Sequence, residues 1–521
     1  MTEDLLQLAE DSTRGSTFLI YGSAISTIVM AIGTILILRF LGPDLYGEYA
    51  LALVVPTLLY SFTDLGLNEG IIKYVASLRA KGEEERAKRI IGHGLALRTV
   101  IGLAIFAIDF FFADLFATLI NRPGLGFLIR IASVSIVFQV VFTTAASASV
   151  GLDRAEYNAT ITGLNAFAKT VIQVALVLLS FGVAGALIGY VGGYAVASLV
   201  GLGLILTKMR ASNKYKGTDK FFKNAKTLAT YGFPLYISVL LTSLSPLYQN
   251  LIIAYYTPTN VDIGNLRSAA NFVTLITVLT IPISTALLAS FSKLDSSTHK
   301  KIQDFFKIAN KYMCLIIVPT ATLIIVFSKQ IVQIVYGSSY QSAPLFLSLS
   351  SLTYFLVAIG FGVLGSLFNG LGETRTTFKM TLIGFLVFTV LSPLMIRPWG
   401  VPGMLIASLI SSTASALYAT DAARRKYKIE FSTIAIIKTY VISAIASVPG
   451  LVIVYMTALP NVLKLAAGAL LYLFAYATLL PLTGTVTSSE LQKVKEITQR
   501  IRMLGFIARP LIKYMERFSM Q

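Results

Sequence analysis

Long stretches without a charged residue dominate this sequence. Residues 17–38 contain no charged side chain over 22 positions, residues 227–261 none over 35, and residues 330–372 none over 43. A helix needs about 20 apolar residues to cross the hydrocarbon core of a bilayer. Only helices and closed barrels pair every backbone polar group in lipid, and these runs far exceed the length of a barrel strand. The pattern therefore predicts an all-α polytopic membrane protein.

The same pattern predicts fourteen transmembrane helices. They cover residues 17–38, 46–67, 90–112, 127–150, 158–181, 183–206, 228–256, 264–291, 308–328, 343–368, 377–396, 400–420, 434–456 and 463–483. Six of these helices belong to each of two repeats, and the last two follow the second repeat.

The repeat is visible in the residues themselves. Residues 182–188 read Gly-Val-Ala-Gly-Ala-Leu-Ile and residues 400–406 read Gly-Val-Pro-Gly-Met-Leu-Ile, at an offset of 218. Further pairs at similar offsets are Tyr21-Gly22 with Tyr231-Gly232, Gly47 with Gly264, and Gly151-Leu152 with Gly370-Leu371. A unit of about 220 residues is too long for a solenoid repeat and indicates a duplicated half-protein.

This duplication predicts the domain organisation. The predicted parts are an N-terminal segment (1–16), a first six-helix lobe (17–206), a basic linker (207–227), a second six-helix lobe (228–420), two further helices (434–483) and a basic tail (484–521). In the tail, apolar residues from Leu491 to Ile507 recur every three or four positions with basic residues between them. That spacing predicts an amphipathic helix on the inner membrane surface, with docking of a partner as the alternative.

Composition and charge agree with a membrane protein and set its orientation. Hydrophobic residues make up 55% of the chain, charged residues only 13%, and the net charge is +18. With the N-terminus placed inside, 36 of the 43 basic residues lie on the inner side or in helices entered from it. The other seven are Arg39, Arg122, Arg130, Arg267, Lys329, Arg397 and Lys464. This asymmetry predicts the cell (cytoplasmic) membrane with both termini cytoplasmic, and it explains the basic balance without a nucleic-acid partner.

Several kinds of chemistry find no support in the sequence. No Gly-Lys pair occurs, so the phosphate-binding loop of ATPases is absent, and two histidines with one cysteine cannot form a conventional zinc cluster. We therefore expect no catalytic residues, no metal site and no cofactor. The single Cys314 also excludes an intramolecular disulfide.

Short motifs near the predicted helix ends resemble those of a known family. They are Leu-Gly-Pro-x-x-Tyr-Gly at 41–47, Asp-Leu-Gly-Leu at 64–67, Gly-Leu-Asp-Arg at 151–154, Ile-Val-Tyr-Gly at 334–337 and Asn-Gly-Leu-Gly-Glu at 369–373. Together they resemble the polysaccharide-transporter family, the O-antigen and oligosaccharide-lipid flippases. The superfamily also holds the multidrug-and-toxin extruders and the lipid II flippase. The resemblance covers nearly the whole chain.

That resemblance implies a function and partners. It implies a flippase that moves a lipid-linked oligosaccharide, carried on polyprenyl phosphate or pyrophosphate, across the membrane by alternating access for polysaccharide biosynthesis. Membrane lipids are then partners, and glycosyltransferases or a polymerase of the same pathway are candidate partners. Parallel repeats place the expected substrate site between two lobes.

Ionisable residues inside the predicted helices are the best pointers to a site, because they are costly in hydrocarbon. Asp109 lies at the outer end of its helix, where we expect its carboxylate to reach water. Asp64 and Arg98 lie nearer the inner ends of adjacent helices. They can form an ion pair that joins the helices, or they can bind a ligand; the sequence leaves both open.

Lys169 falls near the middle of its predicted helix, with no acidic residue elsewhere in that helix. Asn165 and Gln173 lie one turn to either side, and Asn158 and Thr162 continue the line. Spacings of three and four put these five residues on one helical face. We call this face the polar stripe, and we expect it to look into a bundle or a water-filled cavity.

Two functions fit these residues. A flippase for an anionic lipid-linked sugar needs cationic groups partway across the membrane, and Lys169 and Arg98, with Asn165, Gln173 and Asp64 near them, suit that role. A proton- or sodium-coupled multidrug exporter binds lipophilic cations and needs buried carboxylates instead. Because the deepest ionisable group is a lysine, the sequence favours the flippase. A scaffold protein would need neither this lysine nor a duplicated bundle.

Overall fold

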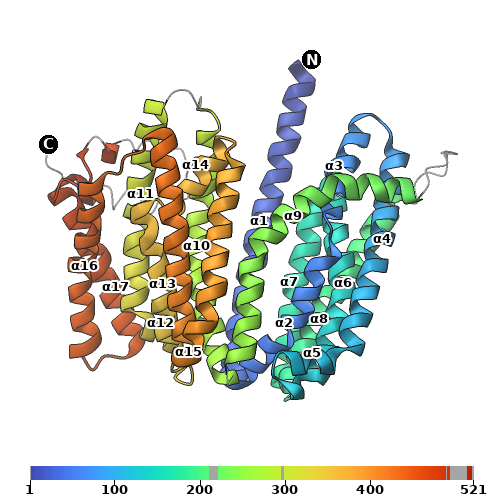
Figure 1. The fold of residues 1–521 in the computed structure, drawn as a ribbon, viewed down its shortest axis with the longest axis horizontal. Coiled ribbons are helices and arrows are strands. Elements are labelled where there is room, and N and C mark those ends of the chain that lie inside the picture. Colours follow the sequence, from blue (N-terminus) through green and yellow to red (C-terminus); the bar gives the residue numbers. More distant parts are fainter. Residues whose placement is uncertain are drawn as a thin grey trace. The chain divides into compact units, whose positions relative to one another are not determined.

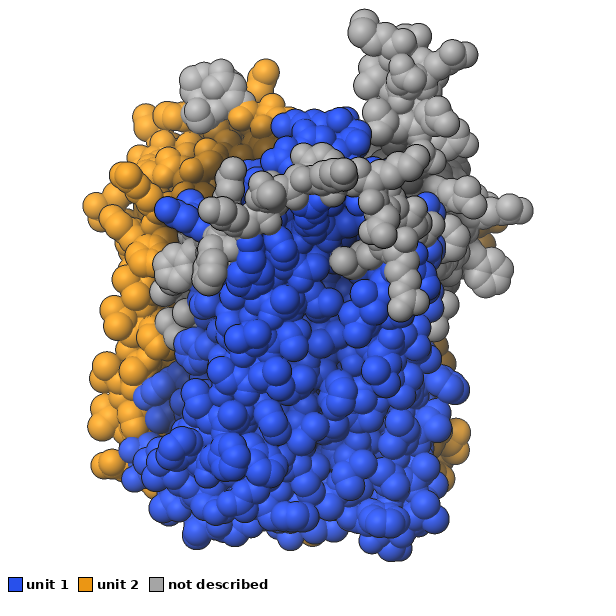
Figure 2. Space-filling view, turned by 90° about the vertical axis from the view of Figure 1, so that its right-hand side faces the viewer, with its two compact units in different colours: residues 1–264 blue, residues 265–521 orange. Residues whose placement is uncertain are grey.

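The computed structural model describes residues 2–209, 221–257, 259–294, 299–488, 490–492 and 513–518 (Figure 1). It is 88% helical, and no strand occurs in the described ranges. The predicted all-α membrane fold is confirmed. The predicted basic linker and amphipathic tail lie largely outside these residues. The chain divides into two compact units, residues 1–264 (unit 1) and 265–521 (unit 2), coloured in Figure 2.

Unit 1 contains the helices of the first predicted lobe and one more long helix. They are α1 (Thr2–Ala52), α2 (Val54–Tyr60), η1 (Ser61–Thr63), α3 (Leu67–Ala80), α4 (Glu84–Phe111), α5 (Ala113–Leu119), η2 (Pro123–Leu125), α6 (Gly126–Gly151), α7 (Ala155–Leu178), α8 (Gly182–Met209) and α9 (Phe221–Tyr256). The first residues of α10 (Asn260–Phe291) complete it.

Unit 2 contains the remainder of α10 and the helices that follow. They are α11 (His299–Val326), α12 (Ser328–Tyr336), α13 (Ala343–Ser351), η3 (Leu352–Ile359), α14 (Leu364–Gly370), α15 (Thr374–Tyr427), α16 (Thr433–Met456) and α17 (Asn461–Leu482). The division into lobes at 17–206 and 228–420 stays a prediction.

Most residues of each predicted transmembrane range are helical, but some ranges share a helix and others are divided between two. The first two meet within α1, which breaks at Gly42, and the eleventh and twelfth meet within α15, which breaks at Gly400. Within the described residues, nine helices are long and apolar enough to cross a membrane, or ten if the pair α13–η3 and α14, bent by 54°, counts as one. The number fourteen therefore stays a prediction.

The sequence pattern missed helix α3. Its polar residues break the apolar run, so no transmembrane range was predicted there, yet Leu67, Ile71 and Val75 are at most 1% exposed. These three side chains pack in a core with residues of α4, α6, α7, α8 and α9, including the fully buried Leu228. The helix thus closes one end of unit 1 by burying a single apolar face.

The recurring glycine segment forms the same local turn in both units. Gly182 opens α8 at φ +54°, and Gly400 divides α15 at φ +60°. Three residues on, Gly185 lies against Leu176, and Gly403 lies against the carbonyl of Met395. A Cβ at either position would collide with the preceding helix. The first glycine supplies a backbone conformation that other residues rarely adopt, and the second permits close packing.

Candidate functional site

Helices α7 and α8 pack closely along the polar stripe. Gly189 and Gly193 lie one turn apart on α8, on the side that meets α7. A Cβ on Gly189 would lie 2.4 Å from the backbone N of Gln173, and one on Gly193 would lie 2.4 Å from Cβ of Lys169. Small residues spaced by four let two membrane helices approach backbone to backbone. The stripe therefore faces the interior of the helix bundle.

Lys169 is held against an aromatic ring. Its Nζ lies 4.3 Å from the centroid of the Tyr190 ring on α8. No described carboxylate forms an ion pair with it, and Asp64 pairs with Arg98. A cation over an aromatic face contributes about 2 kcal/mol where water is excluded, but it does not neutralise the charge. The ammonium thus keeps its capacity to bind an anion.

Aromatic side chains continue from this lysine across the unit. The ring of Tyr190 lies 5.2 Å from that of Tyr194, which in turn lies 5.5 Å from the ring of Phe142 on α6. Large rings have few rotatable bonds, so they present a fixed surface at small entropic cost. The sequence analysis did not single out these residues. Two tyrosines four positions apart in a glycine-rich helix were the available signal.

The two amides that flank Lys169 are bonded differently. Gln173 is 5% exposed, and its Nε2 donates to the hydroxyl of Tyr49 at 3.0 Å and to the carbonyl of Ala186 at 2.9 Å. It therefore joins α7 to α1 and α8. Asn165 is equally buried, but its Nδ2 has no hydrogen-bond partner among the described residues. A buried donor without a partner is costly, so Asn165 is the more available of the two for a ligand.

Arg98 on α4 ties several helices together. The side chain is fully buried, and Nη1 donates to Oδ1 of Asn68 at 2.6 Å and to Oγ1 of Thr144 at 2.8 Å. Its Nε lies 3.5 Å from Oδ1 of Asp64, so the structure contains the ion pair that the sequence allowed. Nη2 has no hydrogen-bond partner among the described residues. The guanidinium thus links α4 to α3, α6 and the end of η1.

A tyrosine connects the arginine to the lysine region. The hydroxyl of Tyr60 on α2 donates to Oγ1 of Thr143 at 3.2 Å, and Thr143 also accepts from Nη1 of Arg98 at 3.0 Å. Thr143 directly follows Phe142, whose ring contacts that of Tyr194. Arg98 and Lys169 therefore belong to one polar interior of unit 1, built from α2, α4, α6, α7 and α8.

The expectation for Asp109 was wrong. Its side chain is fully buried, and neither carboxyl oxygen has a hydrogen-bond partner among the described residues. The chain does not leave α4 into an open loop, because α5 begins at Ala113 and packs on α6 beside α4. The C-terminal end of α4 is thereby enclosed. No group of three potential metal ligands was found in the described part of the chain.

Comparisons with known proteins agree on the fold. The family model described as polysaccharide biosynthesis protein matches residues 12–295, more than half of the chain. Stage V sporulation protein B of Bacillus subtilis (strain 168) is 24% identical over 460 residues, which cover 81% of this chain and 87% of that protein.

Two solved structures superpose on most of the chain. The lipid II flippase MurJ, in an inward closed conformation, gives a TM-score of 0.69 at 17% identity, covering 89% of this chain and 98% of that one. An inward-facing multidrug resistance MATE family transporter gives 0.58 at 17% identity, covering 79% and 98%. At 17% identity the similarity shows only the fold. The binding chemistry has to be inferred from the side chains described above.

Proposed function

Because the chain belongs to the polysaccharide biosynthesis protein family, we propose that it is a flippase for an oligosaccharide linked to polyprenyl phosphate or pyrophosphate. It is a membrane transport protein and not an enzyme. The substrate's lipid tail stays in the bilayer, and its glycan crosses the cytoplasmic membrane by alternating access. Both chain termini lie in the cytoplasm in this proposal. Similarity to the lipid II flippase MurJ supports the substrate class.

The observation that carries the proposal is the state of Lys169. An ammonium inside a membrane bundle is expensive unless it is paired or hydrated. Here it rests on Tyr190 and has no ion pair with a described carboxylate. A phosphate forms charge-assisted hydrogen bonds with an ammonium, and these exceed a cation–π contact in strength. Binding of the carrier's phosphate would therefore draw Nζ away from the ring.

The other predicted site residues divide into two roles. Asn165 offers an unpartnered Nδ2 one turn from Lys169, so it supplies a second donor to the phosphate. Gln173 has both amide hydrogens engaged with other helices, so it positions α7. Arg98 and Asp64 position α3, α4 and α6, and Nη2 of Arg98 remains free to contact the glycan or its phosphate.

A proton- or sodium-coupled multidrug exporter is the second candidate. One specific observation favours it, the buried and unpartnered carboxyl of Asp109. Such a group suits a coupling-ion site, and the likeness to a MATE transporter fits it. However, the lysine near the middle of α7 would repel the lipophilic cations that such exporters carry.

Binding by the purified protein distinguishes the two candidates. We expect a polyprenyl pyrophosphate glycan to bind Lys169→Ala about ten- to a hundredfold more weakly than the parent, since one charge-assisted contact is lost. Lys169→Arg should keep much of the affinity, and the difference should shrink as salt rises. Lys81→Ala, at an exposed lysine after α3, is the control. Equal binding by Lys169→Ala and Lys81→Ala, with ethidium bound more tightly by Lys169→Ala, would favour the exporter.

A further inference from the structure

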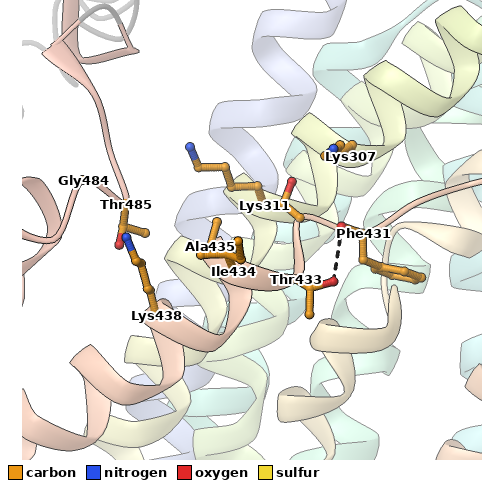
Figure 3. Close-up of a pocket in the computed structure, with 10 residues that line it drawn as sticks. Lys307, Lys311, Phe431, Thr433, Ile434, Ala435, Lys438, Gly484 and Thr485 are labelled. Atoms are coloured by element: carbon orange, nitrogen blue, oxygen red, sulfur yellow. Dashed lines mark hydrogen bonds between the residues drawn. The ribbon is translucent and has the colours of Figure 1, made fainter.

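A basic pocket opens at one end of unit 2, outside the region discussed so far. It has a volume of about 420 Å³ and lies among the third and fourth turns of α11, the start of α16 and the chain after α17 (Figure 3). Three lysines line it, Lys307 and Lys311 from α11 and Lys438 from α16. The remaining lining residues are Phe431, Ser432, Thr433, Ile434, Ala435, Gly484 and Thr485. We call it the lysine pocket.

The lysines of this pocket are only partly neutralised. Nζ of Lys311 lies 2.7 and 3.0 Å from the two carboxylate oxygens of Glu490. Nζ of Lys438 donates to the carbonyl of Thr483 at 2.6 Å, which does not remove its charge. Lys307 has no ion-pair or hydrogen-bond partner among the described residues. Among the described residues, only Lys311 of these three lysines has an ion pair, so the lining of the pocket carries an excess of positive charge.

Glu490 remains ionised beside these lysines. Burial alone would raise the pKa of its carboxyl, but hydrogen bonds from Lys311 and from Thr487 outweigh burial and hold that pKa below its ordinary value. The carboxylate therefore competes with any anion for Lys311. Removal of the Glu490 carboxylate should therefore raise the affinity of the pocket for an anion. This effect can be tested without changing a lysine.

The backbone adds to this charge. Helix α16 has 24 residues and begins at Thr433, and the side chain of its N-cap Ser432 caps none of the free backbone groups. Thr433, Ile434 and Ala435, whose N–H groups belong to the first turn, all line the pocket. The N-terminal end of a helix carries a partial positive charge and favours anions, phosphate in particular.

Isolated lysines on a surface would not make a site. Here three lysines from two helices line one volume, which lies within the range of small-molecule pockets, roughly 300–1,000 Å³. A phosphate with a substituent fills such a volume better than a bare ion does. An ammonium is also a strong point-charge ligand for phosphate.

We propose that the lysine pocket binds a phosphate-bearing anion, on the side of the membrane that the distribution of basic residues assigns to the cytoplasm. The chemistry suits the head group of an anionic phospholipid and equally a soluble phosphate. This site shares no residue with the candidate site in unit 1, and it does not depend on the transported substrate.

Binding to the full-length purified protein tests the proposal in two arms. In the first arm, delipidated protein in detergent is titrated with phosphatidylglycerol or phosphatidylcholine, and bound lipid is counted by native mass spectrometry. In the second arm, inorganic phosphate is titrated and the melting temperature is followed, because a ligand that binds the folded state raises it. The variants are Lys307→Gln, Lys438→Gln and Glu490→Gln. Lys300→Gln, at an exposed lysine of the same helix α11, is the matched control.

We expect Lys307→Gln and Lys438→Gln each to weaken binding about tenfold relative to Lys300→Gln, since each removes one charge-assisted contact. Glu490→Gln should strengthen binding severalfold, so a folding defect in a lysine variant does not leave the proposal untested. If the lysine substitutions weaken only the binding of phosphatidylglycerol, the ligand is a lipid head group. If they weaken only the binding of inorganic phosphate, the ligand is a soluble anion. Either result supports the site. Identical affinities for Lys307→Gln and Lys300→Gln in both arms, or an unchanged affinity in Glu490→Gln, would overturn it.

Discussion

Helices α7 and α8 of unit 1 and the two halves of α15 in unit 2 reverse direction on nearly the same seven residues, 182–188 and 400–406. The backbone angle of the first glycine is almost equal, at φ +54° for Gly182 and +60° for Gly400. Both segments then bring a glycine, Gly185 or Gly403, against the preceding helix. The turn is thus a shared structural device.

The side chains on the two pairs of half-helices differ in kind. Counted with the offset of 218 that aligns the turns, the polar stripe residues Asn165, Lys169 and Gln173 correspond to apolar residues. Their counterparts are Ile383, Val387 and Leu391. The hairpin of unit 2 is therefore apolar at the three positions where the hairpin of unit 1 carries polar groups. This difference limits the anion-binding role that we propose to unit 1.

The two units also differ at the glycine face, which we define as Gly189 and Gly193 on α8. Gly189 and Gly193 of α8 correspond to Ala407 and Ser411 of α15. In unit 2 the serine hydroxyl donates to the carbonyl of Gly384 at 2.6 Å, so a hydrogen bond joins the half-helices there. In unit 1 the absence of side chains lets the backbones touch and leaves the space beside them to Lys169.

The largest expected effect concerns transport by Lys169 variants. In proteoliposomes with a polyprenyl pyrophosphate glycan, Lys169→Ala should lower the initial rate roughly ten- to a hundredfold, because the phosphate loses its cationic contact. Val387→Ala, at the related position in unit 2, should leave the rate nearly unchanged. Equal losses in both variants, at equal amounts of folded protein, would mean that the two hairpins contribute alike.

A second test addresses the glycine face. Gly189→Val places a side chain against the backbone of Gln173, and we expect it to destabilise the protein by about 3 kcal/mol. Gly203→Val, on the same helix, is the control, because a Cβ there meets nothing within 4 Å. Thermal unfolding in detergent measures both. If Gly189→Val and Gly203→Val have the same melting temperature, then α7 and α8 are not packed through their backbones.

Asp109 offers a third comparison. Helices α4 and α11 both end at a phenylalanine of similar backbone angle, Phe112 (φ −98°) and Phe327 (φ −102°). Three residues before it, α4 has Asp109, whereas α11 has the buried apolar residue Ile324. Replacing an unpartnered buried polar group by an apolar one removes its desolvation cost, so Asp109→Leu should stabilise the protein by about 1–3 kcal/mol. Thermal unfolding tests this, and a clear drop in stability would reveal a partner for the carboxyl.

The smallest effect concerns the turns Gly151–Arg154 and Gly370–Glu373. In unit 2 Nζ of Lys426 lies 2.6 Å from Oε2 of Glu373, and this hydrogen bond lowers the pKa of the carboxyl below its ordinary value. A lowered pKa adds stability above the unfolded value of about 4.3, and that stability is lost as the pH falls through the folded value. We therefore expect Glu373→Gln to destabilise the protein at pH 7 but not below pH 3.

The size of that effect should be about 0.5 kcal/mol or less, because both side chains are partly exposed and water screens the pair. Asp153→Asn in unit 1 is the control, since Asp153 has no ion pair among the described residues. Melting curves between pH 3 and 7 provide the measurement. A loss of stability in Glu373→Gln that does not vary with pH would show that packing, and not charge, is responsible.

The sequence by itself determined the fold class, the position of most helices outside α3, the glycine turns and the family. Hydropathy is a property of one segment, since lipid requires each crossing helix to be apolar along its own length. Positive φ at Gly182 and Gly400 is likewise a local demand. For the same reason the spacing of Asn165, Lys169 and Gln173 could place them on one face before any neighbour was known.

Only the tertiary structure decided what those faces meet. It buried Asp109, paired Asp64 with Arg98 and set Lys169 on the ring of Tyr190. It also gathered the lysines of α11 and α16 around one pocket. These contacts join residues from different helices, and helix packing depends on surfaces that no single segment contains. The chemistry of this protein follows from those contacts.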